Sequence, residues 1–213
     1  DRRDPYATEV EPDSGEASRI AGAGGFAWSD SDWMLHRNRR NSLGAPVSIY
    51  EVHPGSWRRV PEEGDRRLRA EEFAELLAGH AEYLGFTHVA LVGVLDQPEM
   101  ARPGFEADSW FAPDSRFASP EGIERLVDTL HQRQIGVLLD FPVGGFSTGG
   151  RGLEQFDGSA LYEDLEAAAP PGCRAFRITC PEVRSYLISS ALYWLGRYHL
   201  DGLRVSGVDW LAG

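Results

Sequence analysis

Residues 70–92 read AEEFAELLAGHAEYLGFTHVALV and carry a helix signal followed by a strand signal. Apolar side chains in the first part recur at steps of three and four residues, which predicts a helix with one buried face over Ala70 to Leu84. Gly85 supplies the left-handed residue that commonly ends a helix, and the apolar run from His88 to Val92 predicts a strand. Another strand is predicted at Ser48 to Val52, so the order strand, helix, strand indicates two neighbouring parallel strands.

The same alternation continues along the rest of the sequence. A second helix is predicted to open at Ser119-Pro120, which combines an N-cap residue with a first-turn proline. The remaining elements are strands at Val137 to Leu139, ending at Asp140, and at Leu203 to Val205, with a helix that begins at Pro181 between them. Four strand-helix units with long loops after the strands predict an α/β fold, the first half of a TIM-type (β/α)8 barrel. An open half would leave its two outer strands unpaired.

Composition and charge exclude several classes of protein. Hydrophobic residues make up 42% of the 213, which argues against intrinsic disorder, and no apolar run reaches the roughly 20 residues of a membrane span. The basic residues are all Arg and the formal net charge is −12, which argues against nucleic-acid binding. Cys173, Cys180 and six scattered histidines support neither a disulfide framework nor a metal site, and no cofactor is expected. We expect a cytoplasmic protein and, because the chain starts at Asp1, a piece of a longer product.

Five runs of sequence carry a resemblance to a known family. They are SIYEVHPGSWRR at 48–59, YLGFTH at 83–88, FDGSALYE at 156–163, ALYW at 191–194 and DGLRV at 201–205. Together they resemble the glycogen (1,4-alpha-glucan) branching enzymes of the α-amylase superfamily, glycoside hydrolase family 13. Residues 4–34 resemble the tail of the β-sandwich carbohydrate-binding module that precedes the barrel in that family. We therefore predict two parts: residues 1–40 as the tail of this module and a linker, and residues 41–213 as the N-terminal half of the catalytic barrel.

The resemblance implies a retaining transglycosylase that cuts an α-1,4-glucan and rejoins the piece through an α-1,6 bond, with glycogen or amylose as its glucan partner. This chemistry needs one carboxylate that attacks the anomeric carbon and one acid that protonates the leaving oxygen. In the family the nucleophile is an Asp at the end of strand four, two residues after an Arg. Here the Arg is Arg204, and the nucleophile position holds Ser206. The family's acid/base Glu on strand five and its His-Asp pair on strand seven would lie beyond Gly213.

The resemblance also assigns substrate-binding positions, most of which depart from the family pattern. Asp140 matches the family's Asp, whereas Gly145 stands in place of a substrate-binding His. Phe105 replaces a Tyr that stacks under the reactive sugar, and Glu106 replaces a Gln. Phe can still stack against a sugar but cannot donate a hydrogen bond. Three tryptophans near presumed strand ends are further candidates for sugar stacking, with core packing as the alternative: Trp57, Trp110 and Trp210.

The strand that carries Arg204 also limits which residue can replace the missing nucleophile. Alternation along a strand places Arg204 and Ser206 on the same side. Asp209, the nearest following carboxyl group, falls on the opposite side or in the next loop. A lone serine hydroxyl is a poor nucleophile unless a neighbouring base activates it.

Three hypotheses follow. The first is a branching-enzyme-like chain that is catalytically inactive, because Ser206 replaces the nucleophile and strands five to eight are missing from these residues. The second is a non-catalytic α-glucan-binding or regulatory pseudoenzyme that retains Asp140 and Arg204. The third is an active half of a split enzyme whose remaining strands come from another chain, and Ser206 argues against it. A protein partner, or self-association, that covers the open barrel edges is a further expectation.

Overall fold

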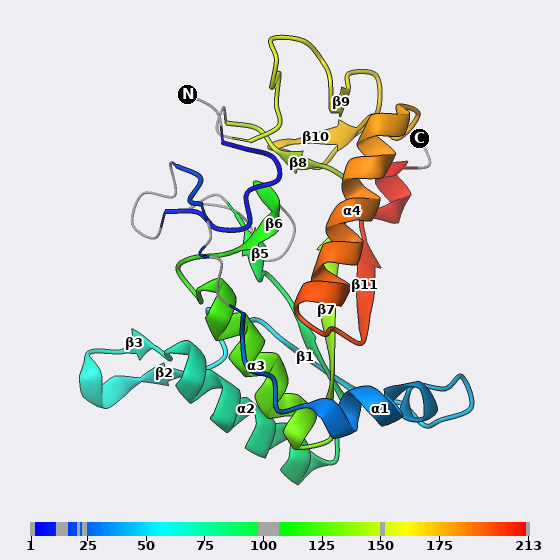
Figure 1. The fold of residues 1–213 in the computed structure, drawn as a ribbon. Coiled ribbons are helices and arrows are strands. Elements are labelled where there is room, and N and C mark those ends of the chain that lie inside the picture. Colours follow the sequence, from blue (N-terminus) through cyan, green and yellow to red (C-terminus); the bar gives the residue numbers. More distant parts are fainter. Residues whose placement is uncertain are drawn as a thin grey trace.

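The fold is built around a four-stranded parallel sheet in a computed structural model that describes residues 3–11, 17–20, 22, 25–97, 107–149 and 152–211 (Figure 1). The strands of this sheet are β1 (Ile49–Val52), β4 (His88–Leu91), β7 (Gly136–Pro142) and β11 (Gly202–Ser206). They lie side by side in the order β1-β4-β7-β11, and every neighbouring pair is parallel. Successive strand-helix units of a barrel produce this order, so the predicted partial α/β barrel is confirmed.

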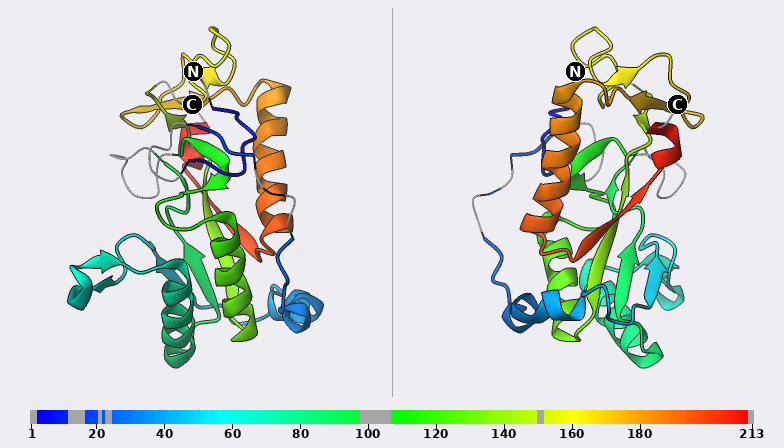
Figure 2. Two further views of the ribbon diagram at one scale, coloured as in Figure 1. Left: turned by 60° about the vertical axis from the view of Figure 1, so that its left-hand side comes forward. Right: turned by 90° about the vertical axis from the view of Figure 1, so that its right-hand side faces the viewer.

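Three helices connect these strands: α2 (Ala70–Leu84), α3 (Pro120–Gln132) and α4 (Pro181–Arg197). Figure 2 shows α2 and α3 next to each other on the outer side of the sheet. The end signals act as predicted. Ser119 Oγ accepts a hydrogen bond from the Gly122 N–H at 3.2 Å at the start of α3, and Gly85 takes a left-handed φ of 75° after α2.

Short elements that the sequence patterns did not predict fill the loops. They are the hairpin β2 (Arg59–Val60) and β3 (Arg66–Arg67), the antiparallel pair β5 (Leu95–Asp96) and β6 (Ser109–Pro113), the small sheet β8 (Phe146–Ser147), β10 (Cys173–Phe176) and β9 (Glu163–Asp164), and the 3-10 turns η1 (Pro61–Glu63) and η2 (Val208–Leu211). Most of these strands have two residues, which is too short for a periodic signal.

A buried tryptophan on β6 links the sheet to α4. The Trp110 indole N–H donates to the carbonyl of Pro142, at the end of β7, at 3.2 Å. The Trp110 carbonyl accepts hydrogen bonds from Ser190 Oγ at 2.6 Å and from the Trp194 indole N–H at 2.7 Å, both on α4. Trp110 has no exposed surface, so the core-packing alternative holds for it and the sugar-stacking one is wrong.

The residues before β1 lie against the barrel part. The helix α1 (Ser31–Arg40) follows a stretch in which Val10 and Ser18 form an isolated antiparallel bridge. The Trp33 side chain on α1 is buried, and its indole N–H donates to Asp201 at 2.9 Å. The division of the chain at residue 40 stays a prediction.

The strand β7 is longer than its sequence pattern suggests. It was expected to end at Asp140, but the ladder with β11 continues through the pair Ser206 and Pro142. Asp140 therefore lies inside β7, two residues before its end, where pairing with Arg204 on β11 fixes the backbone that carries it.

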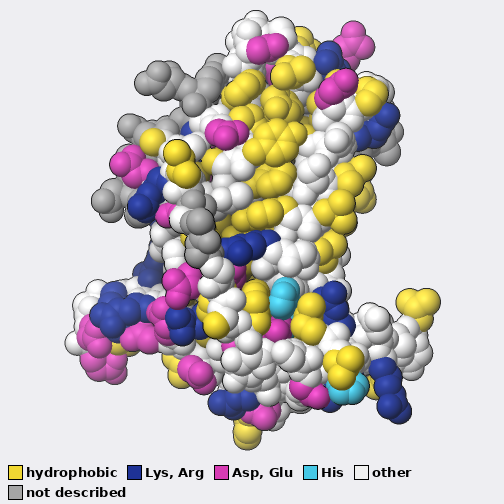
Figure 3. All heavy atoms as spheres, viewed as in Figure 1, with side chains coloured by type: hydrophobic (Ala, Val, Ile, Leu, Met, Phe, Trp, Pro, Cys, Tyr) yellow, Lys and Arg dark blue, Asp and Glu magenta, His cyan; other side chains and the backbone are white. Residues whose placement is uncertain are grey.

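The outer strands of the sheet carry apolar side chains in solvent. Ile49 on β1 is 47% exposed and Val205 on β11 is 51% exposed. On α4, Ile188 and Leu192 are also exposed. Figure 3 shows hydrophobic side chains in a column down the face of the molecule beside and over α4. Within the described residues, no helix has the length and apolar character needed to cross a membrane.

Candidate active site at the strand ends

Asp140, Arg204 and Ser206 come together on two neighbouring strands. Asp140 on β7 lies in register with Arg204 on β11, so the two side chains meet on the same face of the sheet. Arg204 Nε lies 3.4 Å from Asp140 Oδ1, and Ser206 Oγ donates a hydrogen bond to Asp140 Oδ2 at 3.3 Å. Arg204 and Ser206 thus face the same carboxylate, as their two-residue spacing predicted.

The Asp140 carboxylate is held in a site that disfavours its charge. Its side chain is only 3% exposed, and burial raises the pKa of this carboxyl group, an effect that the nearby Arg204 and Ser206 offset in part. Glu51, from β1, adds a second negative charge and pairs with the Arg204 guanidinium. A buried carboxyl group with a raised pKa at the strand ends of a barrel is typical of functional sites.

Glu51 is a residue of this site that the sequence patterns missed. It lies on β1, at the opposite edge of the sheet from Arg204 on β11, and the two side chains meet over the strands between them. The β1 strand was predicted, but alternation along a single strand does not reveal which distant strand curls toward it. A charged residue in the middle of an otherwise apolar predicted strand was the available signal.

The geometry limits what Ser206 can do chemically. Its hydroxyl has a neighbouring carboxylate, Asp140, which the sequence did not reveal as a possible base. A carboxylate is a far weaker base than a serine alkoxide, so it leaves the hydroxyl mainly protonated. If Ser206 Oγ nevertheless attacked an anomeric carbon, the product would be an ordinary glycoside, which is no more reactive than the glucan itself. An aspartate at this place would form a glycosyl ester, with a carboxylate as the leaving group of the second step.

Gly145 occupies a place with no room for a side chain. A Cβ atom on it would lie 2.4 Å from the carbonyl oxygen of Arg174, on β10. The preceding Gly144 is equally close to backbone, since its Cβ would lie 2.6 Å from the carbonyl oxygen of Gly207. The loops after β7 and β11 therefore touch through their main chains at the side of the site. Position 145, where the resemblance implies a histidine, therefore has no room for one in this structure.

The variant Gly145→His is expected to destabilise the chain by more than the about 1 to 3 kcal/mol typical of overpacking, because the obstacle is main chain and not a flexible side chain. Thermal unfolding followed by circular dichroism measures the change. Gly44→His is the matched control, since a Cβ on Gly44 meets nothing within 4 Å, and it should change stability by less than about 0.5 kcal/mol. Equal melting temperatures for the two variants would contradict the packing argument.

Phe105 and Glu106 lie outside the described residues, so their place relative to Asp140 stays a prediction. Trp57, another candidate for sugar stacking, is half-buried and packs edge-on against Phe73 at 5.5 Å between ring centroids. Its indole N–H donates to the Tyr50 hydroxyl at 2.8 Å. This side chain therefore serves packing between β1 and α2.

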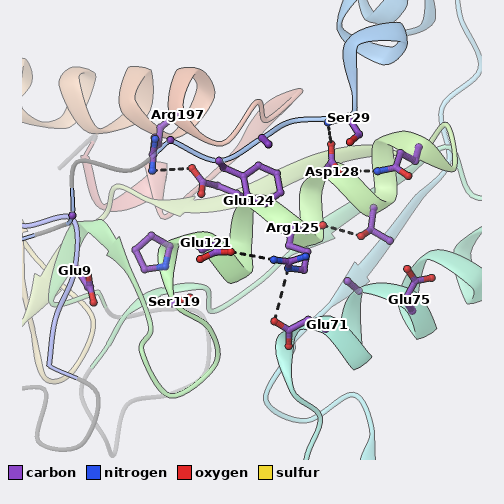
Figure 4. Close-up of a pocket in the computed structure, with 18 residues that line it drawn as sticks. Glu9, Ser29, Glu71, Glu75, Ser119, Glu121, Glu124, Arg125, Asp128 and Arg197 are labelled. Atoms are coloured by element: carbon purple, nitrogen blue, oxygen red, sulfur yellow. Dashed lines mark hydrogen bonds and ion pairs between the residues drawn. The ribbon is translucent and has the colours of Figure 1, made fainter.

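A groove of about 910 Å³ lies away from the strand ends, between the surface of α2 and α3 and residues 25–29 (Figure 4). Carboxylates dominate it, and its two arginines already have partners. Arg125 Nη2 lies 3.0 Å from Glu121, and Arg197 Nη2 lies 2.9 Å from Glu124. None of the strand-end residues lines this groove, so it is separate from the candidate site.

Sequence comparison finds close relatives across nearly the whole chain, although no protein-family model matches it. The 1,4-alpha-glucan branching enzyme GlgB of Aquifex aeolicus is 45% identical over 212 residues, which cover 98% of this chain and 34% of the relative. The GlgB of Salinibacter ruber is 42% identical over 217 residues, covering 98% of this chain and 35% of the relative. The chain thus spans about a third of the length of the curated relatives it matches.

Comparison with solved structures shows the same fold. A putative alpha amylase from Salmonella typhimurium superposes with a TM-score of 0.77 at 24% identity, covering 96% of this chain and 32% of that one. A pullulanase from Paenibacillus barengoltzii, solved with maltotriose, gives a TM-score of 0.76 at 21% identity and covers 96% and 37%. Over nearly its whole length this chain is therefore similar to the 1,4-alpha-glucan branching enzymes, and it corresponds to about a third of the length of one of them.

Proposed function

We propose that this chain is a branching-enzyme homologue without transglycosylase activity of its own. The observation that carries the proposal is Ser206, which stands two residues after Arg204 and beside Asp140, where the resemblance places the nucleophilic aspartate. Retaining glucan transfer needs a glycosyl ester between substrate and enzyme, and a serine hydroxyl cannot form one.

A second candidate function is α-glucan binding without turnover, which the state of Asp140 favours. The fold keeps this carboxylate buried, although the pKa shift shows that its charge disfavours the folded state. Unfavourable groups persist mainly where function needs them. Asp140 and Arg204 together offer a hydrogen-bond acceptor and a donor to sugar hydroxyls at the strand ends.

The variant Asp140→Asn tests this second function and separates it from a purely structural role. We expect the variant to melt at a higher temperature than the wild type at pH 7, and to be retained about tenfold or more weakly on immobilised amylose, since it loses a charged acceptor. Affinity electrophoresis in amylose gels and thermal unfolding supply the two readouts. A variant that melts at a higher temperature but migrates in amylose gels like the wild type would contradict the glucan-binding function. The first proposal, an inactive homologue, would then remain.

The difference in melting temperature between the wild type and Asp140→Asn should depend on pH in a definite direction. The pKa of Asp140 is higher in the folded than in the unfolded chain, so the folded state binds this proton more tightly. Its contribution to stability is therefore most favourable at low pH, and it declines as the pH rises from about 3.9, the unfolded value, through the folded value. The gap in melting temperature between Asp140→Asn and wild type should widen from pH 4 to pH 7. A constant gap would contradict the burial argument.

We further propose that the exposed edges of the sheet are covered in the working protein, by a protein partner or by self-association, and that its location is cytoplasmic. The half-exposed Ile49 and Val205 on the outer strands support the first statement, because unpaired apolar edge strands favour association. The low cysteine content, two residues in 213, fits a reducing compartment.

A further inference from the structure

A buried histidine bridges two aspartates at the end of the sheet opposite the candidate site. His131, in the last turn of α3, has no exposed surface. Its Nδ1 lies 2.9 Å from Asp30 Oδ2, and its Nε2 lies 3.0 Å from Asp201 Oδ2. The carboxylates of Asp30 and Asp201 are almost completely buried as well. Asp30 directly precedes α1, and Asp201 directly precedes β11, so one imidazole joins three segments that are far apart in sequence.

Hydrogen-bond chemistry favours a charged imidazole here, because each ring nitrogen lies against a buried carboxyl group. An ionised carboxylate only accepts hydrogen bonds, so a nitrogen beside each carboxylate must donate. The neutral imidazole has one N–H and would leave one buried carboxylate facing a lone pair. The doubly protonated ring satisfies both partners and places one positive charge between two negative ones.

The groups packed around His131 are consistent with two ionised aspartates. The Asp201 oxygens also accept hydrogen bonds from the Val137 N–H at 2.7 Å and the Trp33 indole N–H at 2.9 Å. Burial alone would raise the pKa of Asp201, but these donors and His131 outweigh it and hold the pKa below its ordinary range. Asp30 Oδ2 also forms a hydrogen bond with a second imidazole, since His199 Nδ1 lies 2.9 Å from it.

The remaining charged and titratable groups near this cluster bond to other partners, or they reach it only through an intervening side chain. Asp128, one turn earlier on α3, accepts hydrogen bonds from the Ser29 N–H and from Gln132. His88, at the start of β4, reaches the cluster only through Asn41, which itself bonds Asp201. Arg37 on α1 donates to the carbonyls of residues 199 and 200. None of these contacts supplies His131 with another partner.

We propose that His131 is a proton-dependent latch that holds α1 and the segment before it to the start of β11 while the imidazole carries both ring protons. Loss of one proton breaks a buried contact to Asp30 or Asp201, which weakens the attachment of α1. The latch lies at the start of the strand that carries Arg204 and Ser206, since Asp201 directly precedes β11 and its carboxylate accepts a hydrogen bond from the Val137 N–H on the neighbouring β7. The proposal does not depend on glucan binding or on the fate of the nucleophile.

The test is a pH titration of the chain by NMR, with 15N labelling of histidine rings and tryptophan indoles. At pH 7.5, where an exposed imidazole is mostly neutral, both nitrogens of His131 should show the shifts and attached protons of an imidazolium. His36, on the exposed side of α1, is the internal control and is followed in the same titration. As the pH rises further, the Trp33 indole resonance should shift or broaden together with the loss of the His131 proton, since both groups share Asp201.

The variant Asp30→Asn sharpens this test. It removes one of the two charges that hold the imidazolium, so His131 should become mainly neutral at pH 7.5 while His199, which shares the same oxygen, loses its partner too. His199→Gln is the matched control, because it leaves both His131 contacts in place and should leave the His131 titration unchanged. If Asp30→Asn does not fold, the wild-type titration still decides. A singly protonated His131 in the wild type at pH 6 to 7.5 would overturn the proposal, as would a Trp33 signal that ignores the His131 proton.

Discussion

Incubation of this chain with amylose is expected to leave the absorbance of the amylose–iodine complex unchanged, whereas a branching enzyme lowers it. Loss of a catalytic nucleophile slows enzymes by factors on the order of 10⁴ to 10⁶, which places any activity of this chain below detection beside the GlgB of Aquifex aeolicus as the reference. The physical reason is local. Ser206 offers a hydroxyl where the reaction needs a carboxylate, and the adjacent Asp140 is bonded to it and to Arg204.

Two variants at position 206 help to explain the result of the iodine assay. Ser206→Ala should behave like the wild type, because neither side chain can form a glycosyl ester. Ser206→Asp supplies the carboxylate, yet it should also stay inactive in these 213 residues, because the resemblance assigns the proton donor to a fifth strand. Branching activity in the wild type that Ser206→Ala abolishes would contradict the whole argument. Activity that survives in Ser206→Ala would point to another nucleophile.

Trp194→Ala is expected to lower the free energy of unfolding by about 3 to 5 kcal/mol, a large share of the about 5 to 15 kcal/mol available to a typical domain. Trp194 is fully buried, stacks on Tyr198 at 4.5 Å between ring centroids and donates to the Trp110 carbonyl. The substitution removes the ring contacts and leaves that carbonyl with one donor fewer. For a chain of this size the loss corresponds to a fall in melting temperature of about 6 to 20 °C.

Tyr83→Ala is the matched control for this prediction. It also removes an aromatic ring from a helix, but Tyr83 is 87% exposed on α2, so the change should stay within about 0.5 kcal/mol. Thermal and urea unfolding, monitored by circular dichroism, give both values. A Trp194→Ala variant as stable as Tyr83→Ala would show that the link between α4 and β6 contributes little.

The parallel sheet was predictable because its signals are local and repeat. The helix from Ala70 to Leu84 has the predicted bounds, since its apolar spacing and Gly85 define both its face and its end. By contrast, α1 was not predicted, because residues 4–34 were interpreted only through their likeness to a carbohydrate-binding module. The His131 cluster was missed for another reason. It joins residues about 70 to 100 positions apart, and scattered histidines give no signal in a single sequence.

The candidate site was predictable only along a single strand. Alternation along β11 sufficed to place Arg204 and Ser206 on one side, whereas their contact with Asp140 depends on the register of β7 against β11, which was not predicted. The surroundings of Gly145 depend instead on the path of β10, which returns to the site about 30 residues later. Loop paths of this kind depend on contacts between whole segments, and no periodic pattern encodes them.

The most direct test of the central claim is trapping with a fluorinated α-glucosyl fluoride, followed by intact-mass measurement. Fluoride leaves without the help of an acid, so the reagent examines the nucleophile alone and does not require a proton donor. The GlgB of Aquifex aeolicus serves as the positive control and should gain the mass of one fluorinated glucosyl group. For this chain the account predicts an unchanged mass. A stable adduct that peptide mapping places on Ser206 would contradict it and show that the serine acts as a nucleophile.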